Sequence, residues 1–104
     1  KVQRYHVERF AEFVAKLANT PDGEGTLLDN SMLLYGSNMG NSNVHSNYPV
    51  PNMLVGGGAG QLHGGRHIDL PEHTSISNLH LTVLNKTGLE LERFGDSSGE
   101  IAGV

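Results

Sequence analysis

The chain has 104 residues, a formal net charge of −4 and no cysteine. This length suits about one domain, and the lack of cysteine excludes disulfide bonds and thiolate metal sites. The acidic charge argues against a nucleic-acid partner, because the chain has no basic stripe to replace the counterions of a phosphate backbone. No run of residues approaches the ~18 apolar positions of a membrane-spanning helix, so we expect no membrane partner.

The first predicted element is an amphipathic helix over residues 1–18. Its apolar side chains recur at the spacing of one helical face: Phe10, Phe13, Val14 and Leu17. We expect the helix to end in residues 19–23, because Pro21 cannot continue it and Gly23 turns readily.

Two short apolar runs follow, at residues 31–35 and 50–55, and both predict buried strands. Pro51 lies near the start of the second run, where a missing N–H group is tolerated. The connection 36–48 leaves the first strand and consists of small polar residues. The glycine-rich loop 56–67 leaves the second.

A second helix is predicted after these loops. Ser75 is a suitable N-cap, the apolar spacing continues to about Lys86, and Gly88 ends the helix. Residues 66–70 are a candidate for a further short strand before it. The tail from residue 89 is short and rich in turns, so we expect it to be peripheral.

This order of elements predicts the α/β class, since buried strands alternating with helices are typical of a sheet layered by helices. In open α/β sheets, ligands gather beyond the carboxyl ends of the strands. The loops 36–48 and 56–67 both follow carboxyl ends. We therefore expect them to meet at one rim of the sheet and to form a site there.

Two residues of these loops are candidates for binding. His45 is either a metal ligand, since imidazole is a common ligand of zinc, or a surface histidine that caps the loop. Arg66 either holds an anion through its guanidinium group or is exposed or paired with Asp69. Sequence reasoning leaves both pairs of alternatives open.

The glycine loop does not fit a nucleotide-binding loop, because no helix and no Lys-Ser/Thr pair follow its glycines. A tight crossing near the sheet edge is the simpler interpretation. His63, His67 and His73 lie on a segment without helical spacing. A three-histidine metal site there is an alternative to separate, unrelated positions.

Four segments, in chain order, carry a family resemblance: RYHVERFAEFVAKLA (4–18), GTLLDNSMLLYGSNMGNSNVH (25–45), PVPNMLVGGGAGQLHGGRHI (49–68) and SISNLHLTVLNKTGLELERFGDSSG (75–99). They resemble a bacterial family of uncharacterised proteins named after an H-x-x-S-H-H motif, related to the alkaline phosphatase and sulfatase superfamily. The naming motif itself is absent. The resemblance implies the C-terminal part of an alkaline-phosphatase-like sheet layered by helices. Residues 1–104 would then be a single domain or the C-terminal fragment of a larger domain.

The resemblance also implies ligand positions. In the superfamily an Asp and a His in the turn after a strand bind one metal, and a later His helps to bind a second. Here Asn38 and Met39 stand at the first two positions, His45 at the third, and Asn78 at an acidic position of the following helix. The implied ligands of a divalent metal such as zinc are therefore His45 and, as a weaker neutral ligand, Asn38. The superfamily nucleophile would lie outside this chain.

Two functions follow from this resemblance. The first is the C-terminal portion of a metal-dependent hydrolase of phosphate or sulfate esters. The second is a non-catalytic binding or structural module that keeps the fold with a degraded metal site. The implied partners are a small-molecule ester or anion and the remainder of the same protein, and the family implies export to the periplasm or beyond. A third hypothesis is a fragment of marginal stability without a function of its own.

Overall fold

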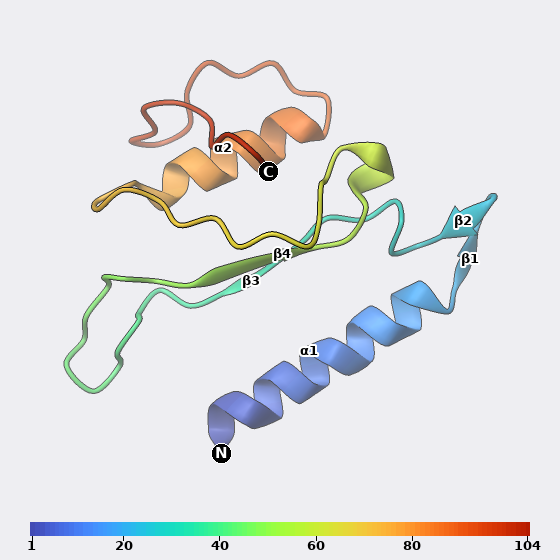
Figure 1. The fold of residues 1–104 in the computed structure, drawn as a ribbon, viewed down its shortest axis with the longest axis horizontal. Helices are drawn as coiled ribbons and strands as arrows, with labels where there is room; N and C mark the ends of the chain where they lie inside the picture. Colours follow the sequence, from blue (N-terminus) through green and yellow to red (C-terminus); the bar gives the residue numbers. More distant parts are fainter.

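The computed structural model describes residues 1–104 as a mixed α/β structure with two helices and two small antiparallel sheets (Figure 1). The elements are α1 (Val2–Ala18), β1 (Pro21–Asp22), β2 (Gly25–Thr26), β3 (Leu33–Gly36), β4 (Asn52–Val55), a short 3-10 turn (Gly58–Gly60) and α2 (Ile76–Lys86). Neither helix combines the length and apolar character needed to cross a membrane.

The prediction of α1 is confirmed, and its wet face is stabilised by ion pairs one turn apart. Arg4 pairs with Glu8 and Arg9 with Glu12, each at 2.8 Å. No residue of α1 is buried. Its clearest contact with the rest of the chain is the Phe10 ring, whose centroid lies 4.6 Å from that of Tyr35 in β3. The apolar face of α1 is therefore only partly covered.

Both predicted strands form, but they pair antiparallel, with Leu33 opposite Val55 and Gly36 opposite Asn52. The carboxyl end of β3 therefore lies beside the start of β4. The expectation that loops 36–48 and 56–67 leave the same rim is wrong. The physical reason lies in the connection between the strands. A parallel pair usually requires a helix that carries the chain back across the sheet. The β3–β4 connection contains no helix, and the chain reverses direction within it.

α2 is confirmed together with its N-cap, since the Ser75 hydroxyl accepts a hydrogen bond from the N–H of Ser77 at 3.1 Å. Its inner side carries Leu81, which is 2% exposed, and the buried polar residues Asn78 and Thr82. These polar side chains bind the tail, which places α2 at the best-packed part of the molecule.

The prediction of a peripheral tail is wrong, because residues 97–101 are bound to α2. The Asn78 side chain accepts from the N–H of Ser98 at 2.9 Å and donates to the Ser98 hydroxyl at 3.2 Å. The Thr82 hydroxyl accepts from the N–H of Ile101 at 2.8 Å. Ser97 is buried as a result.

Two further segments differ from the sequence prediction. Residues 66–70 form no strand, because no neighbouring strand offers them a ladder of hydrogen bonds. In contrast, the turn after α1 forms the β1–β2 hairpin, with Pro21 opposite Thr26. Gly23, at φ 61°, provides the left-handed turn conformation that this hairpin requires.

Candidate functional site

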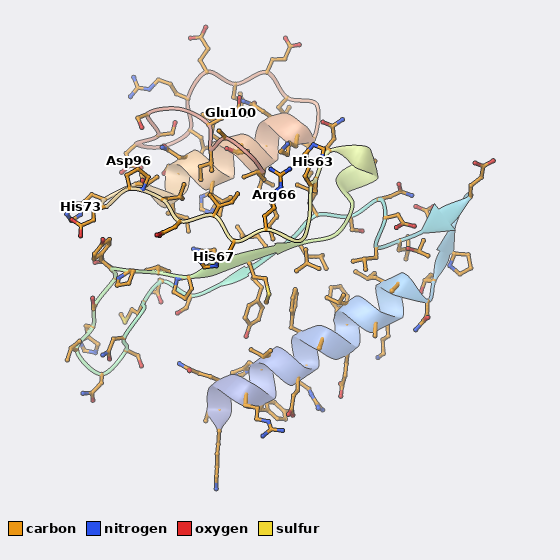
Figure 2. All side chains as sticks on the ribbon, in the orientation of Figure 1. His63, Arg66, His67, His73, Asp96 and Glu100 are labelled. Carbon is orange, nitrogen blue, oxygen red and sulfur yellow. The ribbon has the colours of Figure 1, made fainter.

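The main cavity of the molecule has a volume of about 1010 Å³ and lies between the β3–β4 pair, residues 62–74 and α2. Leu54 of β4 lines it from the sheet, and Ile76 and Leu79 line it from the helix. Figure 2 shows His63, Arg66 and His67 on the segment that runs between the strands and α2. The cavity therefore combines an apolar floor with cationic and imidazole groups.

The glycine loop directs residues 62–74 back along β4. The N–H of Gly57 donates to the Leu28 carbonyl at 3.0 Å, and the N–H of Gly58 donates to the Ser31 carbonyl at 2.9 Å. Gly58 is buried at φ 55°, a conformation that favours glycine. This supports the interpretation of the loop as a tight crossing. It also explains how Arg66 reaches the cavity although the loop leaves the opposite end of the sheet from Asn38.

Residues 63–70 form no backbone–backbone hydrogen bonds. Their N–H and C=O groups must find partners in water or in a bound molecule, since polar backbone groups are costly to leave unpaired. This segment lines one wall of the cavity, so these backbone groups are available to a ligand there.

Arg66 lies on this wall and keeps most of its donors free. Its Nη1 donates to the carbonyl of Gly103 in the tail at 3.0 Å. Neither of the two ion pairs in the chain involves Arg66, so the alternative pairing with Asp69 does not form. A guanidinium group has five N–H donors in a planar fork, and one fixed bond leaves the others available to an anion.

The three histidines of this region, His63, His67 and His73, all line the cavity. The His73 ring also stacks on Tyr48, with centroids 5.2 Å apart. No group of three or more His, Asp or Glu side chains in the chain is arranged to hold a metal ion.

Asn38 and His45, the ligands implied by the family resemblance, both lie in the connection between β3 and β4. Asn38 is exposed and lines the cavity together with Arg66. His45 is exposed near the tip of the connection, beyond a bridge that pairs Asn41 with Ser46. His45 is not part of the cavity wall. The fold thus brings two of the three predicted site residues, Asn38 and Arg66, to one cavity.

Asp96, in the tail that the sequence predicts to be rich in turns, also lines the cavity. Its carboxylate accepts a hydrogen bond from the Ser75 hydroxyl at 2.5 Å, at the start of α2. Hydrogen bonds from Ser75 and then from Ser77 hold the pKa of the Asp96 carboxyl below its ordinary value of 3.8. No local sequence pattern could have indicated the hydrogen bond between Asp96 and Ser75, because these residues are 21 positions apart.

The cavity carries charges of both signs. Arg66 supplies a positive charge on the wall formed by residues 62–74, which also carries the Asp69 carboxylate. The Asp96 carboxylate lies at the N-terminal end of α2, where the helix dipole favours negative charge. The partial positive charge at this end of α2 is already compensated by the Asp96 carboxylate. An anionic ligand would find its attraction at Arg66 and the imidazoles, not at the helix.

Comparisons with family models, with curated proteins and with solved structures find no match to this chain.

Proposed function

We propose that residues 1–104 provide the ligand-binding wall of a phosphate- or sulfate-ester hydrolase related to the alkaline phosphatase and sulfatase superfamily. The single observation that supports the proposal best is the shared cavity of Asn38 and Arg66. Arg66 would bind the anionic head of a small ester through its free N–H donors. Asn38 would orient an ester oxygen through its amide.

The apolar lining fits the second half of such a ligand. Leu54, Ile76 and Leu79 can accept the organic group of an ester while Arg66 holds its charged end. A volume of about 1010 Å³ is ample for an aryl phosphate or aryl sulfate. The ligand class is thus a small organic ester with one strongly anionic group.

The divalent metal of the superfamily, zinc or a similar ion, does not find a complete site in this chain. A catalytic zinc usually has three protein ligands and one open position. His45 and Asn38 offer one imidazole and one neutral amide, and no cluster of three ionisable ligands exists. Any metal site that includes His45 would need ligands from outside residues 1–104, and we therefore assign no step of the reaction to a metal held here. The export of the protein, likewise, is a proposal from the resemblance alone.

Binding of inorganic phosphate, sulfate and 4-nitrophenyl phosphate to the purified protein, measured by calorimetry, tests the cavity. Arg66→Ala should weaken binding about tenfold or more, because a charge-assisted hydrogen bond contributes ~1.5–3 kcal/mol. Arg93→Ala removes the same charge from the exposed tail, away from the cavity, and should leave binding unchanged. Equal losses in both variants would show general electrostatic attraction and would refute the site.

Turnover is tested separately. Release of 4-nitrophenol from the phosphate and sulfate esters, with added zinc and with a chelator, should depend on His45 in the complete enzyme. His6→Ala on α1 is the matched control, since it removes an exposed imidazole far along the chain. An unchanged rate in His45→Ala would rule out its role as a metal ligand.

The second candidate function is a non-catalytic binding module. It is supported by the residues at the turn after β3: by the family resemblance, Asn38 and Met39 stand where the superfamily has Asp and His, and neither is an ionisable metal ligand. This function predicts anion binding that survives the chelator, still depends on Arg66, and is never accompanied by release of 4-nitrophenol.

A further inference from the structure

The cavity wall that carries Arg66 is fastened to the rest of the molecule by a single polar contact. Residues 63–70 form no backbone–backbone hydrogen bonds. Their one side-chain hydrogen bond is the bond from Arg66 Nη1 to the Gly103 carbonyl, which joins residues 37 positions apart. The side chain that is proposed to bind an anion therefore also ties its own segment to the tail.

The tail side of this contact is anchored on α2. The N–H of Ile101 donates to the Thr82 hydroxyl at 2.8 Å, and Thr82 is 2% exposed. Two residues further on, Gly103 is exposed, and its carbonyl accepts a hydrogen bond from Arg66 and from no other group of the chain. A buried residue of α2 thus supports the position of the guanidinium group through a short piece of the tail.

The backbone of Gly103 has a conformation that suits this role. Its φ is 84°, in the left-handed region that favours glycine. A Cβ built at this position would lie 3.5 Å from Nη1 of Arg66, so the guanidinium group lies close against the backbone here. The contact therefore depends on the carbonyl and also on the turn that presents it.

The contact occupies one end of the guanidinium group and leaves one edge free. Nη1 donates to Gly103, whereas Nε and Nη2 of Arg66 make no hydrogen bond within the chain. Nε and Nη2 share an edge of the planar group, and two such donors can bind two oxygens of one anion side by side. The Gly103 carbonyl does not compete with an anion for this edge.

Holding Arg66 at Gly103 favours anion binding in two ways. A long arginine side chain loses rotamer freedom when it binds a ligand, and the contact with Gly103 removes part of this freedom in advance. Asp69 is a competing partner on the same wall of the cavity. With its Nη1 on Gly103, Arg66 forms no ion pair with Asp69, and its free edge remains available.

We propose that Gly103 is a positioning residue of the anion site. Its carbonyl holds Arg66 in the orientation that binds an anion, although Gly103 itself does not line the cavity. Because both partners depend on one immobilised side chain, the coupling is reciprocal, and a bound anion strengthens the docking of residues 102–104. This inference rests on the proposed anion site and adds its control by the tail.

Binding of inorganic phosphate, measured by calorimetry, tests the positioning role. In Gly103→Ala the backbone should leave the left-handed region and turn the carbonyl away from Arg66. Phosphate binding should then weaken about fivefold, at the lower end of typical couplings between sites. Gly103→Asn should restore most of the affinity, because asparagine tolerates this conformation. Gly60→Ala is the matched control: its φ is 89°, no atom lies within 4 Å of an added Cβ, and binding should not change.

Nuclear magnetic relaxation of the backbone amides tests the coupling itself. Without phosphate, Arg66→Ala should increase the fast motion of residues 63–70 and 102–104 together, because it removes their one shared hydrogen bond. Phosphate added to the unsubstituted protein should reduce the motion of residues 102–104. Release of these residues by phosphate would show that the Gly103 carbonyl competes with the anion, and would overturn the proposal.

Failure of this inference and failure of the proposed function give different results. Phosphate binding that weakens in Arg66→Ala but not in Gly103→Ala would leave the anion site standing and refute the positioning role. The same conclusion would follow if Gly103→Asn bound phosphate no better than Gly103→Ala. Absence of phosphate binding to the unsubstituted protein would refute the anion site and the positioning role together.

Discussion

The two helices are held to the same strand pair in very different ways. α1 is the longer helix, with 17 residues against 11, yet none of its residues is buried. Every one of the five buried residues belongs to the glycine loop, α2 or the tail. The difference teaches that apolar periodicity alone does not bury a helix, because burial also needs neighbouring segments that cover its flanks.

On the α2 side, those neighbours are the glycine loop and the tail, fixed by hydrogen bonds from Asn78 and Thr82. On the α1 side, the β1–β2 hairpin and β3 touch only part of the helix. We therefore expect substitutions on the α2 side to cost more stability than matched substitutions on the α1 side. Two pairs of substitutions test this directly, and two further pairs test the contacts that hold the α2 side together, from the largest expected effect to the smallest.

Gly56→Ala should be the most damaging substitution. Gly56 has a φ of 117°, and a Cβ there would collide with the carbonyl oxygen of Ser31. Backbone strain and the collision together should cost about 3 kcal/mol or more. Gly23→Ala in the hairpin after α1 also has a positive φ but meets no atom within 4 Å, and should cost only about 1 kcal/mol. Urea denaturation measures both, and similar costs would contradict the comparison.

Leu81→Ala should come next, because Leu81 is 2% exposed and the surrounding segments cannot close the space it leaves. Its cost should be about 3 kcal/mol. Leu17→Ala makes the same change on α1, where the side chain is only half-buried, and should cost less than half as much. A larger loss for Leu17 would show that α1 is the better-packed helix.

Asn78→Ala should release the tail. It removes two hydrogen bonds to Ser98, one from its N–H and one to its hydroxyl, at a cost of about 2 kcal/mol. Asn85→Ala also removes two bonds, to the backbone of Leu91, but water can replace them at this more exposed position. Exchange of the Ser98 and Ile101 amides should therefore accelerate in Asn78→Ala and not in Asn85→Ala.

Asp96→Asn should have the smallest effect and a defined pH dependence. Because hydrogen bonds lower the pKa of Asp96 in the folded chain, its carboxylate stabilises the fold above the unfolded pKa of about 3.9 and loses this contribution as the pH falls through the folded value. The variant should melt slightly lower than the natural sequence at pH 7, and this difference should shrink steadily as the pH is lowered below the ordinary carboxyl pKa. Asp69→Asn is the control, because the Asp69 carboxylate accepts no hydrogen bond. A difference that stays constant as the pH is lowered until the protein unfolds would exclude the proposed cause.

The sequence predicted the elements well where a local pattern was sufficient. The spacing of Phe10, Phe13 and Val14 indicated α1, and Ser75 indicated the first residue of α2. The two apolar runs located β3 and β4 to within two residues. Each of these signals depends on neighbours along the chain, whose side chains and backbone meet whatever the rest of the molecule does.

Of the candidate site, the sequence and its family resemblance indicated Arg66 and Asn38 as binding residues, and the fold places both at one cavity. The predicted reason for their proximity was wrong, because loops 36–48 and 56–67 leave opposite ends of the antiparallel β3–β4 pair. Arg66 reaches the cavity because the glycine loop turns the chain back along β4. The contributions of Asp96 and of the tail were missed because their partners lie about 20 positions away.

The amino-acid sequence by itself thus determined the helices, the apolar strands and the acidic, cysteine-free character of the protein, because periodicity, capping and charge are properties of neighbouring residues. Only the tertiary structure decided the antiparallel order of β3 and β4, the docking of the tail on α2 and the composition of the cavity. These depend on which way a connection closes and on hydrogen bonds between residues far apart in the chain, and no local pattern encodes either.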